Sequence, residues 1–257
     1  EVDDSLRKKN INKLNTNMFF KHTYDVQYRL PLIENFTSLY ELDINLRAFD
    51  LKNIKLKDVL KNSSVVKMRI NDPEKSLMWL KNFPQLNDLY MSADGYGGTT
   101  KDMNVFEYLT NLEELEMSCT NSENIGFLKN CVKIKKLNIN LTGRYSAAST
   151  VQNIDALKYL TKLEELDISV PEDGKIVGGE SFSYEGLSYC KKLKNLIISS
   201  DAGTNVLANL KSCSALEKLD LKSKHEFNIK LSTPNFYGIN KFDKLKRLNL
   251  DGTRIKF

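Results

Sequence analysis

Two carboxylates in the middle of the chain, Glu116 and Asp167, are of a type that could support catalysis, because a carboxylate pair can act as general acid and general base. Such a pair works when its surroundings push the two pKa values apart. Each residue lies between two apolar neighbours, a pattern typical of a strand that turns the acid away from the core. We expect both side chains to be well solvated on an open sheet, so the pair predicts no acid–base chemistry.

Other patterns that would indicate catalysis or metal binding are missing from the sequence. It contains two histidines, His22 and His225, and neither is part of a His-Glu-x-x-His motif. The sequence has no Walker loop, no Gly-x-Gly-x-x-Gly run and no nucleophile elbow. We therefore expect a protein that is not an enzyme and that holds no cofactor and no metal.

Three of the four cysteines, Cys131, Cys190 and Cys213, recur at one position of a repeated apolar pattern, where another copy has Leu160. This equivalence predicts that they are buried and behave as small hydrophobic residues, not as disulfide partners or metal ligands. Cys119 stands alone, and no Cys-x-x-Cys pair occurs. Unpaired cysteines favour a reducing compartment or an organism that lives without oxygen.

The apolar pattern itself is clearest at Leu157, Leu160, Leu163, Leu166 and Ile168. Gaps of three residues suit a tight helical turn, and the final gap of two residues suits a short strand. One turn and one strand cannot bury their own leucines, so the unit needs a copy on each side.

Such copies occur about nine times between residues 30 and 257. The interval between strands varies from 21 residues (Val65 to Leu86) to 30 residues (Leu163 to Leu193), and the insertions fall after the strand. The spacing from turn to strand hardly changes. A fixed hydrophobic template that recurs in this way predicts a repeat protein.

The run L-x-x-L-x-L, preceded by L-x-x-L-x-x, resembles the leucine-rich repeats of bacterial internalins and of phosphatase-regulating intracellular proteins. The resemblance implies an α/β fold, a leucine-rich repeat solenoid with a curved parallel sheet on its concave face and an irregular or short-helical convex side. We expect the repeat domain at residues 30–257. Residues 1–29 lack the pattern, so we expect them to form an N-terminal cap whose apolar cluster Met18-Phe19-Phe20 covers the first repeat.

Charge and hydropathy limit the class of partner. The formal net charge is +5, and lysines alternate with acidic residues along the chain, which is typical of a mixed, hydrated surface and not of a nucleic-acid-binding stripe. No apolar run is long enough to span a membrane. We therefore expect neither a nucleic-acid partner nor a membrane span.

Residues between the strand anchors should point outward onto the concave face. This face is acidic near the middle of the chain, and we expect the recognition centre there, for a basic or mixed-charge protein surface. The alternative is a hydrated sheet with no partner. The residues of this centre are Glu114, Glu116, Lys136, Asn138, Glu165 and Asp167.

Apolar and aromatic residues add further candidate contacts. Tyr90 and Ile197 are expected on the same outward face, where an exposed tyrosine is a common binding anchor, although scattered apolar surface residues are also normal. Tyr96 and Tyr145 lie in insertions that follow strands. Insertions in repeat proteins often line the binding side, but they can also be simple surface elongations.

These features favour a non-catalytic scaffold that binds a partner protein on its concave face and loop edge. The resemblance to internalins implies a bacterial protein that is secreted or held at the cell surface. Two alternatives remain open: an intracellular, cytoplasmic adaptor or regulatory subunit, and a carbohydrate-binding or structural surface protein, for which the loop aromatics would suit sugar stacking.

Overall fold

The three-residue spacing of the leucines corresponds to a series of backbone hydrogen bonds. The N–H of Leu157 donates to the oxygen of Ile154 (3.0 Å), that of Leu160 to Leu157 (2.9 Å), and that of Leu163 to Leu160 (3.0 Å). Bonds between residues i and i+3 define a 3₁₀ turn, in which side chains three apart point the same way. All four residues are fully buried, so the spacing in the sequence sets both the turn and its buried side.

The computed structural model describes residues 10–16, 30–45, 60–71, 77–92, 103–118, 125–141, 153–170, 183–199, 206–222, 227–230, 242–249 and 253–256. The chain forms two compact units, here called unit 1 (Glu1–Leu112) and unit 2 (Glu113–Phe257). Both consist of the same repeat of 3₁₀ helix, turn and strand.

Among its described residues, unit 1 has four parallel strands in the order β1-β2-β3-β4. Strand β1 precedes residue 30 and pairs with β2, although its segment lacks the leucine spacing. The domain boundary between residues 29 and 30 stays a prediction, and Met18, Phe19 and Phe20 lie outside the described residues. The elements are β1 (Lys13–Asn15), η2 (Leu30–Asn35), β2 (Glu41–Asn45), β3 (Lys67–Asn71), η4 (Met78–Asn82), β4 (Asp88–Ser92) and η5 (Met103–Tyr108).

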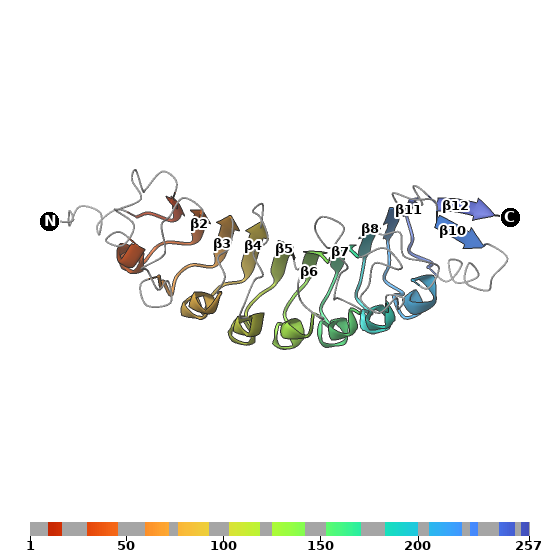
Figure 1. Cartoon of the computed structure of the whole chain (residues 1–257), viewed down its shortest axis with the longest axis horizontal. Helices are drawn as coiled ribbons and strands as arrows, with labels where there is room; N and C mark the ends of the chain where they lie inside the picture. The colour runs from red at the N-terminus through yellow and green to blue at the C-terminus, as the bar shows by residue number, and fades with distance from the viewer. Residues whose placement is uncertain are drawn as a thin grey trace. The chain divides into compact units, whose positions relative to one another are not determined.

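Unit 2 has a parallel sheet in the order β5-β6-β7-β8-β9-β11 and a second, two-stranded parallel sheet of β10 and β12. The 3₁₀ helices η6 to η9 form a row along one side of the strands (Figure 1). The elements are β5 (Glu114–Ser118), η6 (Gly126–Asn130), β6 (Lys136–Asn140), η7 (Asp155–Tyr159), β7 (Glu165–Ser169), η8 (Glu185–Tyr189), β8 (Asn195–Ser199), η9 (Leu207–Leu210), β9 (Lys218–Lys222), β10 (Phe227–Lys230), β11 (Arg247–Asn249) and β12 (Thr253–Lys256).

A shared carbonyl aligns each strand with the one before it. The N–H groups of Lys135 and Lys136 both donate to the oxygen of Glu113, at 2.8 and 3.1 Å. In the next repeat, Glu164 and Glu165 donate in the same way to Lys135. Because this joint lies directly before each strand, the strands stay in register whatever the length of the preceding insertion.

The register places the predicted strand anchors in one buried row. Leu115, Leu137, Leu166, Leu196 and Leu219 are at most 2% exposed, and they are consecutive partners in the sheet. Burial of each such side chain contributes roughly 1.5–3 kcal/mol. The prediction that these leucines point inward is confirmed.

The ninth predicted repeat departs from the pattern. Leu248 stands at the position of this strand that Leu166 occupies in β7, where the repeated pattern predicts a buried anchor, but it is 41% exposed. It lies on β11, an edge strand of its sheet among the described strands, so its side chain lacks a neighbouring repeat on one side. The prediction of a buried Leu248 is therefore wrong. Within the part of the chain that the structure describes, no helix is long and apolar enough to cross a lipid bilayer.

Candidate functional site

The open side of the unit 2 sheet carries two rows of outward-facing residues. The first row consists of the first residue of each strand, and the middle row consists of the third residue. Hydrogen-bonded register aligns both rows from strand to strand. The first row reads Glu114, Lys136, Glu165, Asn195, Lys218 and Arg247, and the middle row reads Glu116, Asn138, Asp167, Ile197, Asp220 and Asn249.

The part of these rows on β5, β6 and β7 forms a cluster that we call the acidic patch, made of Glu114, Glu116, Lys136, Asn138, Glu165 and Asp167. Neighbouring strands lie about 4.8 Å apart and alternate residues of one strand about 6.6 Å apart. Four carboxylates and one ammonium group are thus gathered on an area of about 10 by 7 Å. The structure therefore brings together the six residues that the sequence placed in the recognition centre.

Few of these charges are paired with one another. Lys136 Nζ lies 3.3 Å from Glu114 Oε1, and both side chains remain about half exposed. Among the described residues, no side-chain hydrogen bond or ion pair is found for Glu116, Glu165 or Asp167. The patch thus keeps most of its negative charge available to a partner.

Asp167 differs from the solvated acid that the sequence predicted. Its side chain is half-buried, and burial raises its pKa above the ordinary value for aspartate; the nearby carboxylate of Asp220 adds to the rise, whereas Lys222 and Lys218 oppose it. The expectation of two equally solvated acids was wrong for Asp167, because the sequence did not reveal how closely its neighbours cover it.

Ile197 borders the patch on the β8 side. It is half-buried and stands in register between Asp167 and Asp220. Asp220 is only 4% exposed, and its carboxylate accepts a hydrogen bond from Asn249 (3.0 Å) and lies 3.9 Å from the ammonium group of Lys222. Ile197 therefore provides a small apolar contact surface between Asp167, which is half-buried, and Asp220, whose carboxylate is hydrogen-bonded.

Alternating charges run along the edge of the sheet, just before the strands. The ion pairs are Glu113–Lys135 (2.7 Å), Glu164–Lys194 (2.6 Å) and Glu217–Lys246 (2.8 Å). In each pair, a hydrogen bond from the lysine is the main reason that the glutamate pKa is lowered. These exposed pairs neutralise each other, so the net charge of the outward face comes from the rows on the strands.

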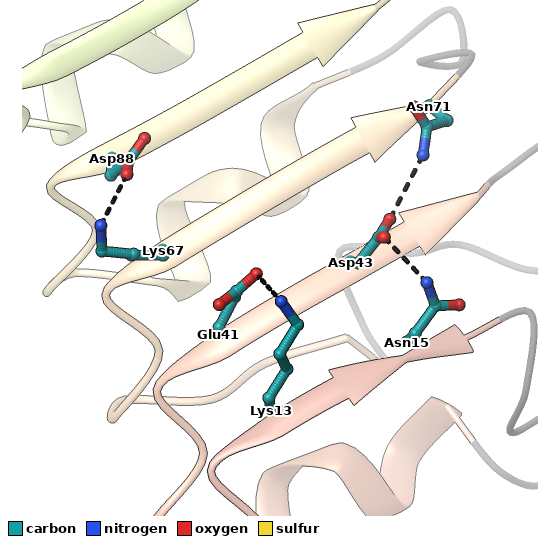
Figure 2. Close-up of polar contacts among 7 residues, drawn as sticks. All are labelled: Lys13, Asn15, Glu41, Asp43, Lys67, Asn71 and Asp88. Carbon is teal, nitrogen blue, oxygen red and sulfur yellow. Dashed lines mark hydrogen bonds and ion pairs between the residues drawn. The ribbon is translucent and has the colours of Figure 1, made fainter.

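Unit 1 has a comparable outward face whose charges are matched internally. Figure 2 shows Lys13 pairing with Glu41 at 2.7 Å and Lys67 with Asp88 at 3.0 Å. Two residues after Glu41 on the same strand, the two oxygens of Asp43 accept separate hydrogen bonds from neighbouring strands (Figure 2). The donors are Asn15 Nδ2 (2.8 Å) and Asn71 Nδ2 (3.2 Å).

Tyr90 lies on this unit 1 face and not in the unit that carries the acidic patch. The guanidinium of Arg69 lies over its ring, 4.3 Å from the centroid, and the side chain is half-buried. A cation–π contact of this kind holds the ring in place, so Tyr90 is less open than the sequence suggested. Tyr96 and Tyr145 lie outside the described residues.

The three repeat cysteines are buried, as predicted, and burial raises their thiol pKa values. The values are about 12 for Cys131, about 12 for Cys190 and about 11 for Cys213. A thiol that stays protonated is a poor nucleophile and a poor metal ligand. Cys119, His22 and His225 lie outside the described residues, and the described part of the chain contains no group of histidine, cysteine or acidic side chains that could hold a metal.

A third row on the same face did not enter the sequence-based site. It consists of the fifth residue of each strand, and on β5 to β8 it reads Ser118, Asn140, Ser169 and Ser199. Extending the two-residue alternation by one more step from Asp167 would have found Ser169. These small polar groups give the acidic patch an uncharged border.

Solved structures that resemble this chain include the following two. An internalin from Listeria monocytogenes matches with a TM-score of 0.51 and 18% sequence identity, over 89% of this chain and 66% of that protein. A leucine-rich repeat protein from Leptospira interrogans matches with a TM-score of 0.62 and 12% identity, over 98% of this chain and 58% of the other. The chain spans less than two thirds of the length of either protein. No protein-family profile and no curated protein sequence matches it.

These likenesses confirm the predicted fold, a leucine-rich repeat solenoid, and the predicted resemblance to internalins. At identities below one fifth, they concern the fold alone. A solenoid of this kind is a repeat scaffold that presents an ordered array of side chains on its sheet, and in this chain the ordered array of unit 2 is acidic.

Proposed function

We propose that this protein is a non-catalytic recognition scaffold whose acidic patch binds a partner protein with a basic or mixed-charge surface. The main observation that supports this proposal is the register of β5, β6 and β7, which gathers four carboxylates around Lys136 and Asn138. Complementary charge speeds encounter and selects among partners. The acids that have no ion pair within the described structure supply that charge.

Rigid positioning supports the proposal. Each outward acid follows or precedes a strand anchor that is at most 3% exposed, such as Leu115, Met117 or Leu166. A side chain on a strand held in this way loses little backbone freedom when a partner binds, because the backbone is already ordered. Ile197 adds an apolar contact beside the charges. The unit 1 face is a weaker candidate, since its acids already have partners on neighbouring strands.

The same geometry argues against acid–base catalysis by the patch. Glu116 is exposed and stands two strands away from Asp167, with Asn138 between them. A catalytic pair would need a shared, water-poor site around the reacting bond. We therefore propose recognition without catalysis.

For the compartment, we propose a bacterial protein that is exported or displayed at the cell surface. The likeness to an internalin supports this at the level of fold. The free cysteines Cys131, Cys190 and Cys213 do not favour a reducing compartment, because buried thiols with raised pKa values react slowly in any compartment. A cytoplasmic adaptor remains the alternative. Detection of the protein in culture medium or on intact cells, compared with a cytoplasmic marker, tests the proposal.

The test of the binding face is charge reversal. The double variant Glu116→Lys with Asp167→Lys should keep the wild-type melting temperature within a few degrees and bind a purified partner at least tenfold more weakly. The partner is first captured by crosslinking to the wild-type protein and identified by mass spectrometry. Affinity is then measured for each variant with the pure components.

A matched control separates the patch from the total charge. Glu185→Lys with Asp243→Lys changes the net charge by the same amount, at exposed residues away from the sheet face. This control should bind within twofold of wild type. Unchanged partner affinity in the patch variant, or equal losses in both variants, would exclude the acidic patch as the binding site.

A further inference from the structure

The side of unit 2 formed by the 3₁₀ helices and their following turns repeats a pairing of tyrosine and lysine. Strands β7 and β8 are in register from Glu165 and Asn195 onward, and η7 and η8 are neighbouring elements of unit 2. Residues at the same distance before the two strands therefore lie side by side. Tyr159 and Tyr189 both lie six residues before their strands, and Lys162 and Lys192 both lie three residues before them.

Six residues of these two repeats make a surface that we call the basic–aromatic strip, namely Lys158, Tyr159, Lys162, Tyr189, Lys191 and Lys192. All six are exposed. The strip carries four positive charges, and the acidic residues of the same two helices, Asp155 and Glu185, lie at the first position of each helix. Among the described residues, Lys162, Lys191 and Lys192 form no ion pair, and the nearby Glu164 is already paired with Lys194 at 2.6 Å.

The tyrosines of the strip are exposed at the same position of two neighbouring repeats. Tyr159 is 45% exposed and Tyr189 is 49% exposed; a single exposed apolar residue is normal, but here register places two rings next to each other. The ammonium group of Lys158 lies 5.3 Å from the centre of the Tyr159 ring. A cation thus stands beside an open ring, and the next repeat supplies a second open ring with lysines close behind it.

We propose that the basic–aromatic strip binds a linear anionic polysaccharide. Its sugar rings would lie on Tyr159 and Tyr189, and its sulfate or carboxylate groups would pair with Lys162, Lys191 and Lys192. A polymer that repeats a ring and a negative charge matches a surface that repeats a tyrosine and a lysine at the spacing of one repeat. This site uses other residues than the acidic patch, so either proposal can fail without the other.

The composition of the strip favours a polysaccharide over other polyanions. Its cations are all lysines, whose compact charge suits scattered anionic groups, whereas arginine is the residue preferred for bidentate recognition of phosphates and for stacking on nucleic-acid bases. An acidic peptide would pair with the lysines, but its repeating unit has no ring to lie on Tyr159 and Tyr189, and polyglutamate tests this alternative.

Binding is measured by fluorescence anisotropy with a labelled heparin octasaccharide at two salt concentrations, with polyglutamate, oligo(dT) and uncharged dextran as comparison probes. Wild type should bind the octasaccharide saturably and more weakly at high salt. Lys162→Glu with Lys192→Glu should lose at least tenfold in affinity. Tyr159→Ala with Tyr189→Ala should lose three- to tenfold for the octasaccharide and stay unchanged for polyglutamate.

The control variant is Lys218→Glu with Arg247→Glu, which makes the same change in net charge on the sheet face; it should bind the octasaccharide within twofold of wild type. All variants are first checked for a wild-type melting temperature. The proposal is overturned if the octasaccharide does not bind or if the tyrosine variant binds it like wild type. It is also overturned if the strip variant (Lys162→Glu with Lys192→Glu) and the control variant lose affinity equally. Tighter, tyrosine-dependent binding of oligo(dT) or polyglutamate would equally overturn it, in favour of that polymer.

Discussion

Replacing Asn62 by alanine should weaken unit 1 by about 2–4 kcal/mol, although the residue touches no proposed binding surface. Asn62 is 4% exposed, and its Nδ2 donates to the oxygens of Ile33 (2.7 Å) and Phe36 (3.1 Å) of the preceding repeat. Its Oδ1 accepts hydrogen bonds from the backbone N–H (2.8 Å) and the hydroxyl (2.6 Å) of Ser64. One side chain thus makes four hydrogen bonds, two of which join its repeat to the preceding one.

The magnitude follows from what remains after truncation. Each buried hydrogen bond contributes about 0.5–1.5 kcal/mol net, so four bonds give about 2–6 kcal/mol, with a central value near 4 kcal/mol. The oxygens of Ile33 and Phe36 each keep a backbone donor, namely Phe36 N–H (3.2 Å) and Leu39 N–H (2.9 Å). They are therefore not left fully unsatisfied, and this lowers the expected loss toward 2 kcal/mol.

The chain contains a single tryptophan, Trp79, which is buried in η4 of unit 1 and packs edge-on against Phe83. Urea unfolding followed by tryptophan fluorescence therefore reports on unit 1. With a slope of about 2 kcal/mol/M, Asn62→Ala should lower the midpoint by about 1–2 M. Asn111→Ala should shift the midpoint less, because the Asn111 amide donates to Pro84 from an exposed position (2.9 Å).

Asn62→Asp gives a second and sharper test. At neutral pH it would place carboxylate oxygens against the carbonyl oxygens of Ile33 and Phe36, so it should destabilise unit 1 more than alanine does. Acid should restore part of the loss, because a protonated carboxyl can donate again. A free energy of unfolding for Asn62→Ala within about 0.5 kcal/mol of wild type, or an Asn62→Asp variant as stable as wild type at pH 7, would refute the reasoning.

Three further predictions concern unit 2. Gly186→Ala should destabilise it by about 1–3 kcal/mol in thermal melts, because the added Cβ would clash with the backbone oxygen of Ile154; an unchanged melting temperature would contradict this packing. Asp167→Asn should raise stability above the ordinary aspartate pKa of about 4, because the folded state resists ionising this buried group. This gain should shrink as pH falls through the raised pKa toward that of the unfolded chain, and a gain that does not vary with pH would be inconsistent with burial as its cause. The buried thiols of Cys131, Cys190 and Cys213 should react with a thiol reagent only after denaturant is added. Fast labelling of the native protein at these residues would show that the thiols are accessible.

The two proposed surfaces of unit 2 have opposite charge and lie on different elements. The acidic patch is on strands β5 to β7, whereas the basic–aromatic strip is on η7, η8 and their turns. A formal net charge of +5 for the whole chain conceals this division. Both surfaces depend on the register of the parallel sheet. Because neighbouring strands are in register, residues at the same position of successive repeats lie side by side and form a row.

Much of the fold follows from local spacing. Gaps of three residues correspond to i to i+3 hydrogen bonds, as at Leu157 and Leu160, and the gap of two separates buried anchors from outward residues such as Glu116. The sequence therefore predicted the strands, the buried side and the members of the acidic patch. It did not predict β1, whose residues lack that spacing and are ordered by pairing with β2.

The sequence did not determine which residues meet across repeats. Lys135 pairs with Glu113, 22 residues away, and Lys194 pairs with Glu164, 30 residues away, because insertions of different length return the chain to the same register. Burial of Asp167 and exposure of Leu248 likewise depend on neighbouring strands.

By itself, then, the sequence determined which side chains face the core and which face outward, since that choice depends on periods of three and two residues along the chain. Only the tertiary structure decided which outward charges neutralise one another, which remain open and which are partly covered. The physical reason is that Coulomb energy and desolvation depend on distance and on surrounding atoms in space, and the stacking of repeats sets both.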